Sequence, residues 1–307
     1  MCPALPITCK PTLKETFSKI LQNNYFFRYC LTMVCKMINL LIWNTFHFLR
    51  IIPKPSSGCI NKIFLTILLI LIITVGLFIC YFDFYIYPTH YGVSYTFSET
   101  ITYLLNDILI PLQSLLVIKG FASLEDLQTD LKTLSLYPKH PLYCLIITSI
   151  HFTSILILIY YDFVSDGSFY GDLDKCYYVV MLSTMLLFYL LNFLLISAAR
   201  LVIGVAVSRL CKSIEDSLKT VGIENIQITI DPIISEYKIM KAKLSFLLFS
   251  LFTVDTILLT AFSYYIAMIF TWGYIPYLFY IMLHLFYIAN VLDESYSALK
   301  SSLPTLR

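Results

Sequence analysis

The chain has 307 residues, of which 59% are hydrophobic and 13% charged, and its mean hydropathy is +0.79. This balance excludes an ordinary soluble domain, which carries about 25% charged residues, and indicates a polytopic membrane protein. The net charge of +2 carries little information, because in a membrane protein the placement of charges matters more than their total. Nothing in the composition suggests a nucleic-acid partner.

Residues 1–62 precede the first clear membrane span. Residues 1–24 lack the apolar core and cleavage site of a secretory signal, so we expect them to stay uncleaved. Residues 25–50 are apolar, but Arg28, Lys36 and Arg50 interrupt them and leave no uncharged run near the ~18 residues that a span needs. We therefore expect a cytosolic or interfacial amphipathic helix here, and a short linker at 53–58.

Six later segments are long and apolar enough to cross a ~30 Å hydrocarbon layer. They are predicted at 63–82, 101–118, 141–161, 176–199, 244–270 and 274–292. The second contains Asn106, Asp107, Pro111 and Gln113, and this polarity indicates a helix that faces protein or water rather than lipid. The predicted protein is all-α, with spans one to four in 63–199 and spans five and six, with an exit helix, in 244–296.

The segment 200–243 between the fourth and fifth spans has a helical pattern. Val207, Leu210 and Ile214 begin an apolar stripe, so the fourth span is expected to continue into the cytosol as an amphipathic helix. Asp231 is predicted to cap the next helix and Pro232 to open it. These extensions and the exit helix after residue 292 are expected to form a cytosolic helical bundle, followed by a cytosolic tail at 297–307.

The basic residues orient these spans. Twenty of the twenty-one Lys and Arg residues lie in 1–62, 119–140, 200–243 and the tail, and only Lys175 lies elsewhere. Basic residues are retained on the cytoplasmic side of short loops, so both termini are predicted to be cytosolic. The loops on the other side carry acidic residues instead: Asp83, Glu99, Asp162, Asp166, Asp172 and Asp174.

The exit from the sixth span reads Ile288-Ala-Asn-Val-Leu-Asp-Glu-Ser-Tyr-Ser-Ala-Leu-Lys300, and an apolar, proline-ended segment at 49–53 leads into the first span. Together with the inverted topology and the helical inner loop, these features resemble an insect-type gustatory receptor over residues 45–307. Glu294 and Ala298-Leu299 match that family's acidic-then-apolar exit, whereas its usual inner-loop Asn is not evident near 241–243.

This resemblance implies a plasma-membrane receptor of the seven-helix ligand-gated ion channel group. A small-molecule tastant would enter an outward-facing pocket among the spans and control a cation pore. The expected partners are the tastant, the lipid bilayer and other receptor subunits, in a homo- or hetero-tetramer.

In that family a seventh helix lines the pore, and this helix carries a Thr-Tyr pair followed by aliphatic residues and Gln-Phe. The chain ends at Arg307, contains no Gln-Phe, and has its Thr-Tyr pair at Thr102-Tyr103 inside the second span. We therefore expect an incomplete gene model; a truncated isoform and a subunit that does not conduct alone are the alternatives.

Candidate ligand contacts are polar or aromatic side chains of the spans. With 24 Tyr and 23 Phe in the chain, most aromatic rings are expected to pack or to lie at the membrane interface. For Asp107, ligand contact and hydrogen bonding between helices are equally favoured, whereas a structural role is favoured for Asp255. His151 and His284 are interpreted as core histidines. The candidates are Asn106, Asp107, Gln113, Tyr160, Tyr161, Asp162, Tyr177, Tyr178, Tyr264 and Tyr265.

Three other classes of protein fit the sequence less well. A serpentine G-protein-coupled receptor with 25–50 as an extra span would export Lys10, Lys14 and Lys19, and the chain has no Asn-x-Ser/Thr sequon. A small-solute transporter would show an internal repeat, but Pro111 and Pro276 lie in unmatched surroundings. An enzyme is opposed by five scattered histidines and by the lack of Cys-x-x-Cys or a phosphate-binding glycine loop, so no catalytic residue, metal or cofactor is expected.

Overall fold

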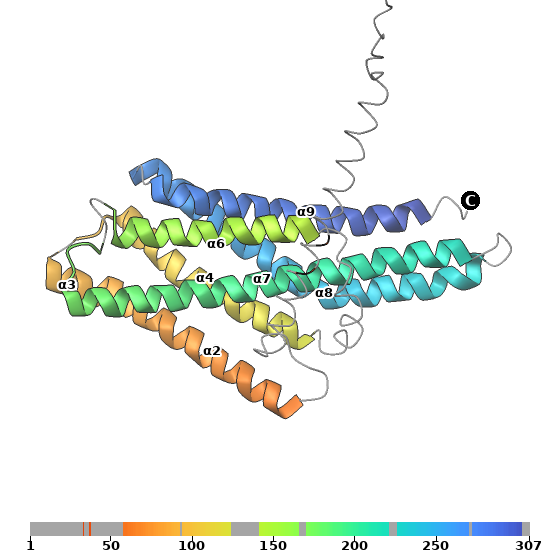
Figure 1. Ribbon diagram of the computed structural model, residues 1–307, viewed down its shortest axis with the longest axis horizontal. Coiled ribbons are helices and arrows are strands. Elements are labelled where there is room, and N and C mark those ends of the chain that lie inside the picture. Colours follow the sequence, from red (N-terminus) through yellow and green to blue (C-terminus); the bar gives the residue numbers. More distant parts are fainter. Residues whose placement is uncertain are drawn as a thin grey trace, which may run out of the picture.

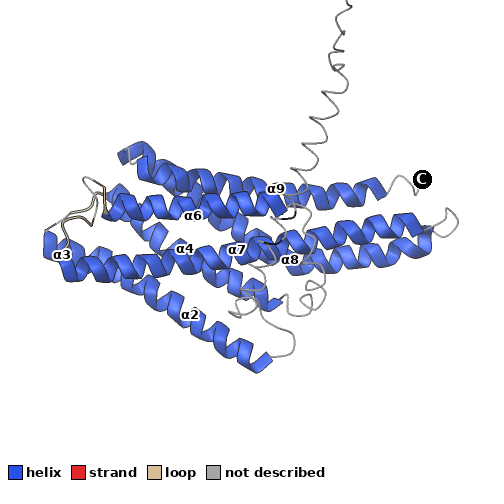
Figure 2. Ribbon diagram, viewed as in Figure 1, coloured by secondary structure: helices blue, strands red, loops and turns tan. Residues whose placement is uncertain are grey.

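The computed structural model describes residues 58–92, 94–123, 141–165, 170–220, 226–269 and 272–302, together with Met33 and Met37. Every regular element in these ranges is a helix, and the long helices form one bundle (Figures 1 and 2). The expected amphipathic helix at 25–50 lies outside the described residues, except that Met33 and Met37 are helical. The expected linker up to residue 57 and the tail after Ser302 also lie outside them.

The helices follow one another in chain order. Helix α2 (Gly58–Tyr81) passes through a π-helical segment, η1 (Phe82–Ile86), into the short α3 (Tyr87–Tyr91). The remaining elements are α4 (Phe97–Ser123), α6 (Pro141–Phe163), α7 (Lys175–Thr220), α8 (Ile226–Ile269), the 3₁₀ turn η4 (Trp272–Tyr274) and α9 (Ile275–Ser302).

Six stretches of the described residues are long and apolar enough to cross a membrane. They are Thr66–Tyr91, Phe97–Phe121, Tyr143–Phe163, Lys175–Gly204, Leu244–Met268 and Trp272–Asp293. Each overlaps a predicted span, so the prediction of six helices that could span a membrane is confirmed. The chain is thus built as a multi-pass membrane protein.

Local signals in the sequence set the turn between the first two spans. Gly92 ends α3 with φ of 64°, a left-handed conformation that glycine adopts without steric cost. Thr96 then begins α4 with a capping box: its N–H donates to Glu99 Oε2 at 2.7 Å, and Glu99 N–H donates to Thr96 Oγ1 at 3.3 Å. These contacts fix where α4 enters the bundle.

Each long helix buries one face and leaves another face apolar. On α2, Ile72 and Ile79 are buried, whereas Ile70 and Leu77 are 57% and 65% exposed. Apolar side chains on the outside are suited to lipid, which solvates them as well as a protein interior does. The bundle therefore has the two apolar environments that a membrane protein needs.

Helices α7, α8 and α9 extend past the apolar stretches. Helix α7 runs on from Gly204 to Thr220, and α8 begins well before Leu244. Figure 1 shows the paired ends of α7 and α8 reaching beyond α6, and the two helices are in contact. The predicted helical continuation of the fourth span is confirmed.

The predicted start of the fifth-span helix is wrong. Helix α8 begins at Ile226, so Asp231 and Pro232 lie inside it rather than at its first turn. A proline within a helix removes one backbone hydrogen bond, and the residues before it can still hold helical geometry. The cap-and-proline pattern therefore misplaced the helix start by about one and a half turns at 3.6 residues per turn.

Candidate functional site

Many of the buried polar and aromatic side chains fall into three groups in the described part of the bundle. Two lie at the end of the bundle where α6 ends and α7 and α9 begin. We name them the Tyr170 cluster (Phe82, Asp83, Tyr87, Phe163, Tyr170, Tyr177) and the Tyr274 cluster (Tyr103, Tyr161, Asp162, Tyr265, Tyr274). The third, the polar core, lies deeper and consists of Gln113, Asn192, Arg200, Asp255, Tyr280 and His284.

The Tyr170 cluster joins the end of α2 to the segment before α7. The Tyr170 hydroxyl donates to Asp83 Oδ1 at 2.7 Å, and its ring lies 4.7 Å from the Phe163 ring, centroid to centroid. Burial, and after it the Asp83 charge, raise the pKa of Tyr170 well above its usual value, so the hydroxyl keeps its proton and remains a donor. Asp83, expected in a loop, is instead 1% exposed.

The Tyr274 cluster joins α4, α6, α8 and the turn before α9. The Tyr274 hydroxyl donates to Asp162 Oδ1 at 3.2 Å, and the hydroxyls of Tyr103 and Tyr265 are 3.0 Å apart. The Tyr265 ring packs edge-on against Tyr274 at 5.2 Å, and the Tyr161 ring lies at 6.3 Å. Hydroxyls and a carboxylate in an aromatic setting can contact a small molecule through both hydrogen bonds and ring surfaces.

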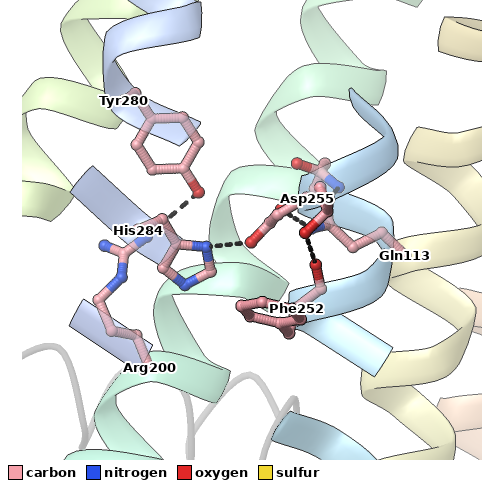
Figure 3. Close-up of polar contacts among 8 residues, drawn as sticks. Gln113, Arg200, Phe252, Asp255, Tyr280 and His284 are labelled. Carbon is pink, nitrogen blue, oxygen red and sulfur yellow. Dashed lines mark hydrogen bonds and ion pairs between the residues drawn. The ribbon is translucent and has the colours of Figure 1, made fainter. Parts of the chain in front are cut away.

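The polar core crosses the bundle from α4 to α9 (Figure 3). Gln113 donates to Asp255 Oδ1 at 2.6 Å, and Asp255 Oδ2 lies 2.7 Å from His284 Nδ1. Since the carboxylate accepts, His284 carries its proton on Nδ1. Asn192 of α7 extends the chain of contacts, with its amide nitrogen 3.4 Å from Gln113 Oε1.

Arg200 is the fully buried cation of this core. Its guanidinium donates to Thr148 Oγ1 at 2.8 Å and to Tyr280 Oη at 3.3 Å, and it lies 5.8 Å from the centre of the Tyr280 ring. The His151 ring also stacks on Tyr280, with centroids 3.8 Å apart. Within the described part of the chain, Arg200 Nε and both ring nitrogens of His151 have no hydrogen-bond partner.

The structure separates the ten sequence candidates. Tyr161, Asp162 and Tyr265 come together in the Tyr274 cluster, Tyr177 joins the Tyr170 cluster with Tyr178 beside it, and Gln113 belongs to the polar core. Asn106 is half-buried next to the buried Asp107, which lies beside Cys80. Tyr160 and Tyr264 are 58% and 50% exposed on the outside of their helices.

The contributors that sequence reasoning missed include Tyr170, Tyr274, Tyr280 and Arg200. Arg200 was expected to begin the inner loop, because it ends a long uncharged run. It instead lies inside the span Lys175–Gly204 and is 0% exposed. Asn192, a lone amide within that uncharged run, was the available signal that α7 has a polar inward face.

The two histidines interpreted as core residues are both 0% exposed. His284 bonds to a neighbouring helix as expected, whereas His151 is held by ring stacking. Asp255 links α4, α8 and α9, which fits the structural role expected for it.

No family model, curated protein or solved structure matches the chain.

Proposed function

We propose that the chain is a chemosensory receptor subunit of the gustatory type, which binds small-molecule tastants at the plasma membrane and takes part in gating a cation pore. One observation carries the proposal. Helices α7, α8 and α9 are each continuous from the Tyr170 and Tyr274 clusters, past the polar core, to ends beyond the apolar stretches.

The physical basis of signalling would be a shift between two arrangements of these helices. A ligand favours the arrangement that it binds more tightly, and the shift can be no larger than this difference in affinity allows. A continuous helix transmits a displacement at one end to its other end. The Tyr103–Tyr265 hydroxyl contact connects α4 to α8 at the proposed ligand end and is the most direct place to perturb this coupling.

The first test concerns topology. An epitope tag before Met1 or after Arg307 is expected to become accessible to antibody only after cells are permeabilised, whereas a tag inserted at 166–169 should be detected on intact cells. The charge distribution is the reason, since Lys and Arg concentrate on the predicted cytosolic side. Detection of the tag before Met1 on intact cells would restore the serpentine-receptor interpretation.

The second test uses adjacent tyrosines on α8. Tyr265→Phe removes a hydroxyl from the Tyr274 cluster, while Tyr264→Phe removes one from a half-exposed ring outside it. In cells that co-express the chain with pore-forming subunits, a tastant panel is screened by calcium influx. We expect Tyr265→Phe to shift the half-maximal tastant concentration by about tenfold, the equivalent of one lost polar contact, and Tyr264→Phe to leave it unchanged. Equal responses from both variants would argue against a ligand end at this cluster.

A further inference from the structure

A groove of about 550 Å³ lies between α6 and α9, away from the Tyr170 and Tyr274 clusters. It is formed by the first turns of α6 and by the middle and later turns of α9. The lining residues are Tyr143, Ile146 and Ile147 from α6, and Leu283, Phe286, Tyr287, Asn290, Val291, Asp293 and Ser297 from α9.

The groove opens sideways within the membrane-spanning part of the bundle. Its α6 residues begin the stretch Tyr143–Phe163, and most of its α9 residues end the stretch Trp272–Asp293. Tyr143, Ile146 and Phe286 are 57%, 45% and 62% exposed, so its rim faces the surrounding lipid. From Leu283 to Asp293, α9 rises about 15 Å, roughly half of a ~30 Å hydrocarbon layer. The groove therefore has the depth of a single leaflet.

Its polarity changes along that depth. The inner part is lined by Ile147, Leu283 and Phe286, whereas Asn290, Asp293 and Ser297 follow at the end of the span. This order matches an amphiphile with a rigid apolar body and a small polar head at the membrane surface. The Asp293 carboxylate accepts hydrogen bonds and repels phosphate, which favours a neutral, hydroxyl-bearing head over a phospholipid head.

We propose that this groove is a binding site for a membrane sterol, with the sterol hydroxyl at Asn290 and Asp293 and the ring system against Ile146, Ile147 and Phe286. The groove shares no lining residue with the Tyr170 and Tyr274 clusters of the proposed tastant site.

The floor of the groove connects it to the polar core. The Tyr287 hydroxyl donates to the Arg200 carbonyl at 3.2 Å and lies 3.4 Å from Cys144 Sγ. Helix α7 comes this close because residue 204 is glycine; a Cβ there would lie 2.8 Å from the Tyr287 hydroxyl oxygen. A sterol that packs on the Tyr287 ring would thus stabilise one position of α7 relative to α9.

The test uses the full chain in phosphatidylcholine nanodiscs that contain a photoactivatable cholesterol analogue. Illumination is expected to label 143–147 and 283–291, as mapped by mass spectrometry, and excess unlabelled cholesterol should remove the label. Cholesteryl methyl ether, which cannot donate a hydrogen bond to Asp293, should compete several-fold less well.

Two tryptophan variants on α6 supply the matched comparison. Ile146→Trp fills the groove, whereas Leu156→Trp adds the same bulk to a lipid-facing position of equal exposure, 46% against 45%. We expect about tenfold weaker labelling for Ile146→Trp and no change for Leu156→Trp, because only the first excludes the ligand.

Three results would overturn the proposal. The first is equal labelling of the two tryptophan variants. The second is labelling of the groove by a photoactivatable phosphatidylcholine that cholesterol fails to displace, which would assign it to phospholipid. The third is cross-linking between two copies of the chain through Tyr143 and Phe286, which would make the groove a subunit contact.

Discussion

Replacement of Asp255 with alanine is expected to lower the free energy of unfolding by about 2–6 kcal/mol, because two buried donors lose their acceptor at a cost of about 1–3 kcal/mol each. Gln113 Nε2 lies 2.6 Å from one carboxylate oxygen and His284 Nδ1 lies 2.7 Å from the other. Asp255 and His284 are 1% and 0% exposed, so water does not replace the lost contacts readily. The change is measured by denaturant unfolding of the purified chain in detergent micelles.

The neighbouring Thr256 provides the control. Its side chain is exposed, and its hydroxyl donates only to the Phe252 carbonyl one turn earlier on α8, at 2.7 Å. Thr256→Ala is expected to change the free energy of unfolding by less than about 0.5 kcal/mol. An equally small change in the free energy of unfolding for Asp255→Ala would mean that the contacts among α4, α8 and α9 do not stabilise the bundle.

The six spans could be predicted from sequence because length and missing charge are sufficient to identify them. The inward orientation of α4 was also readable: Asp107 and Gln113 are both 3% exposed, as the polarity of that segment indicated. Here a polar residue in an apolar segment has only one favourable direction to face.

Which aromatic side chains face inward could not be predicted. Tyr160 is 58% exposed while Tyr161 packs against Tyr274, and Tyr264 is 50% exposed while Tyr265 is 4% exposed. Lipid is as apolar as the protein interior, so the amphipathic periodicity that orients soluble helices is nearly absent here. The rotation of each helix about its axis was therefore undetermined.

The partners of the buried polar groups were equally beyond sequence reasoning. Gln113 and Asp255 are 142 residues apart, and Arg200 and Tyr280 are 80 apart. Only the packing of α4 on α8, and of α7 on α9, brings them together. Arg200 in particular was assigned to a loop because a charge normally marks the end of a span.

Gly273→Ala is expected to lower the free energy of unfolding by about 1–3 kcal/mol, the usual cost of an inserted methyl in a packed site. Gly273 lies in the turn η4 between α8 and α9, and its added Cβ would overlap the Tyr161 ring. The Gly273 backbone does not require glycine, because Gly92 is the only described glycine with a positive φ. The penalty is therefore steric, and unfolding in detergent micelles measures it.

A double-mutant cycle identifies the contact that causes this loss. Tyr161→Ala removes the overlapping ring, so Gly273→Ala should be nearly neutral in that background, giving a coupling of about 1–3 kcal/mol. Tyr160→Ala, which trims the exposed neighbour, should leave the Gly273→Ala penalty unchanged. Additive effects of Gly273→Ala and Tyr161→Ala would contradict the close packing of α6 on η4. Coupling between them would mean that Tyr161 is held against the α8–α9 turn, so that any ligand contacting this ring must act through that turn.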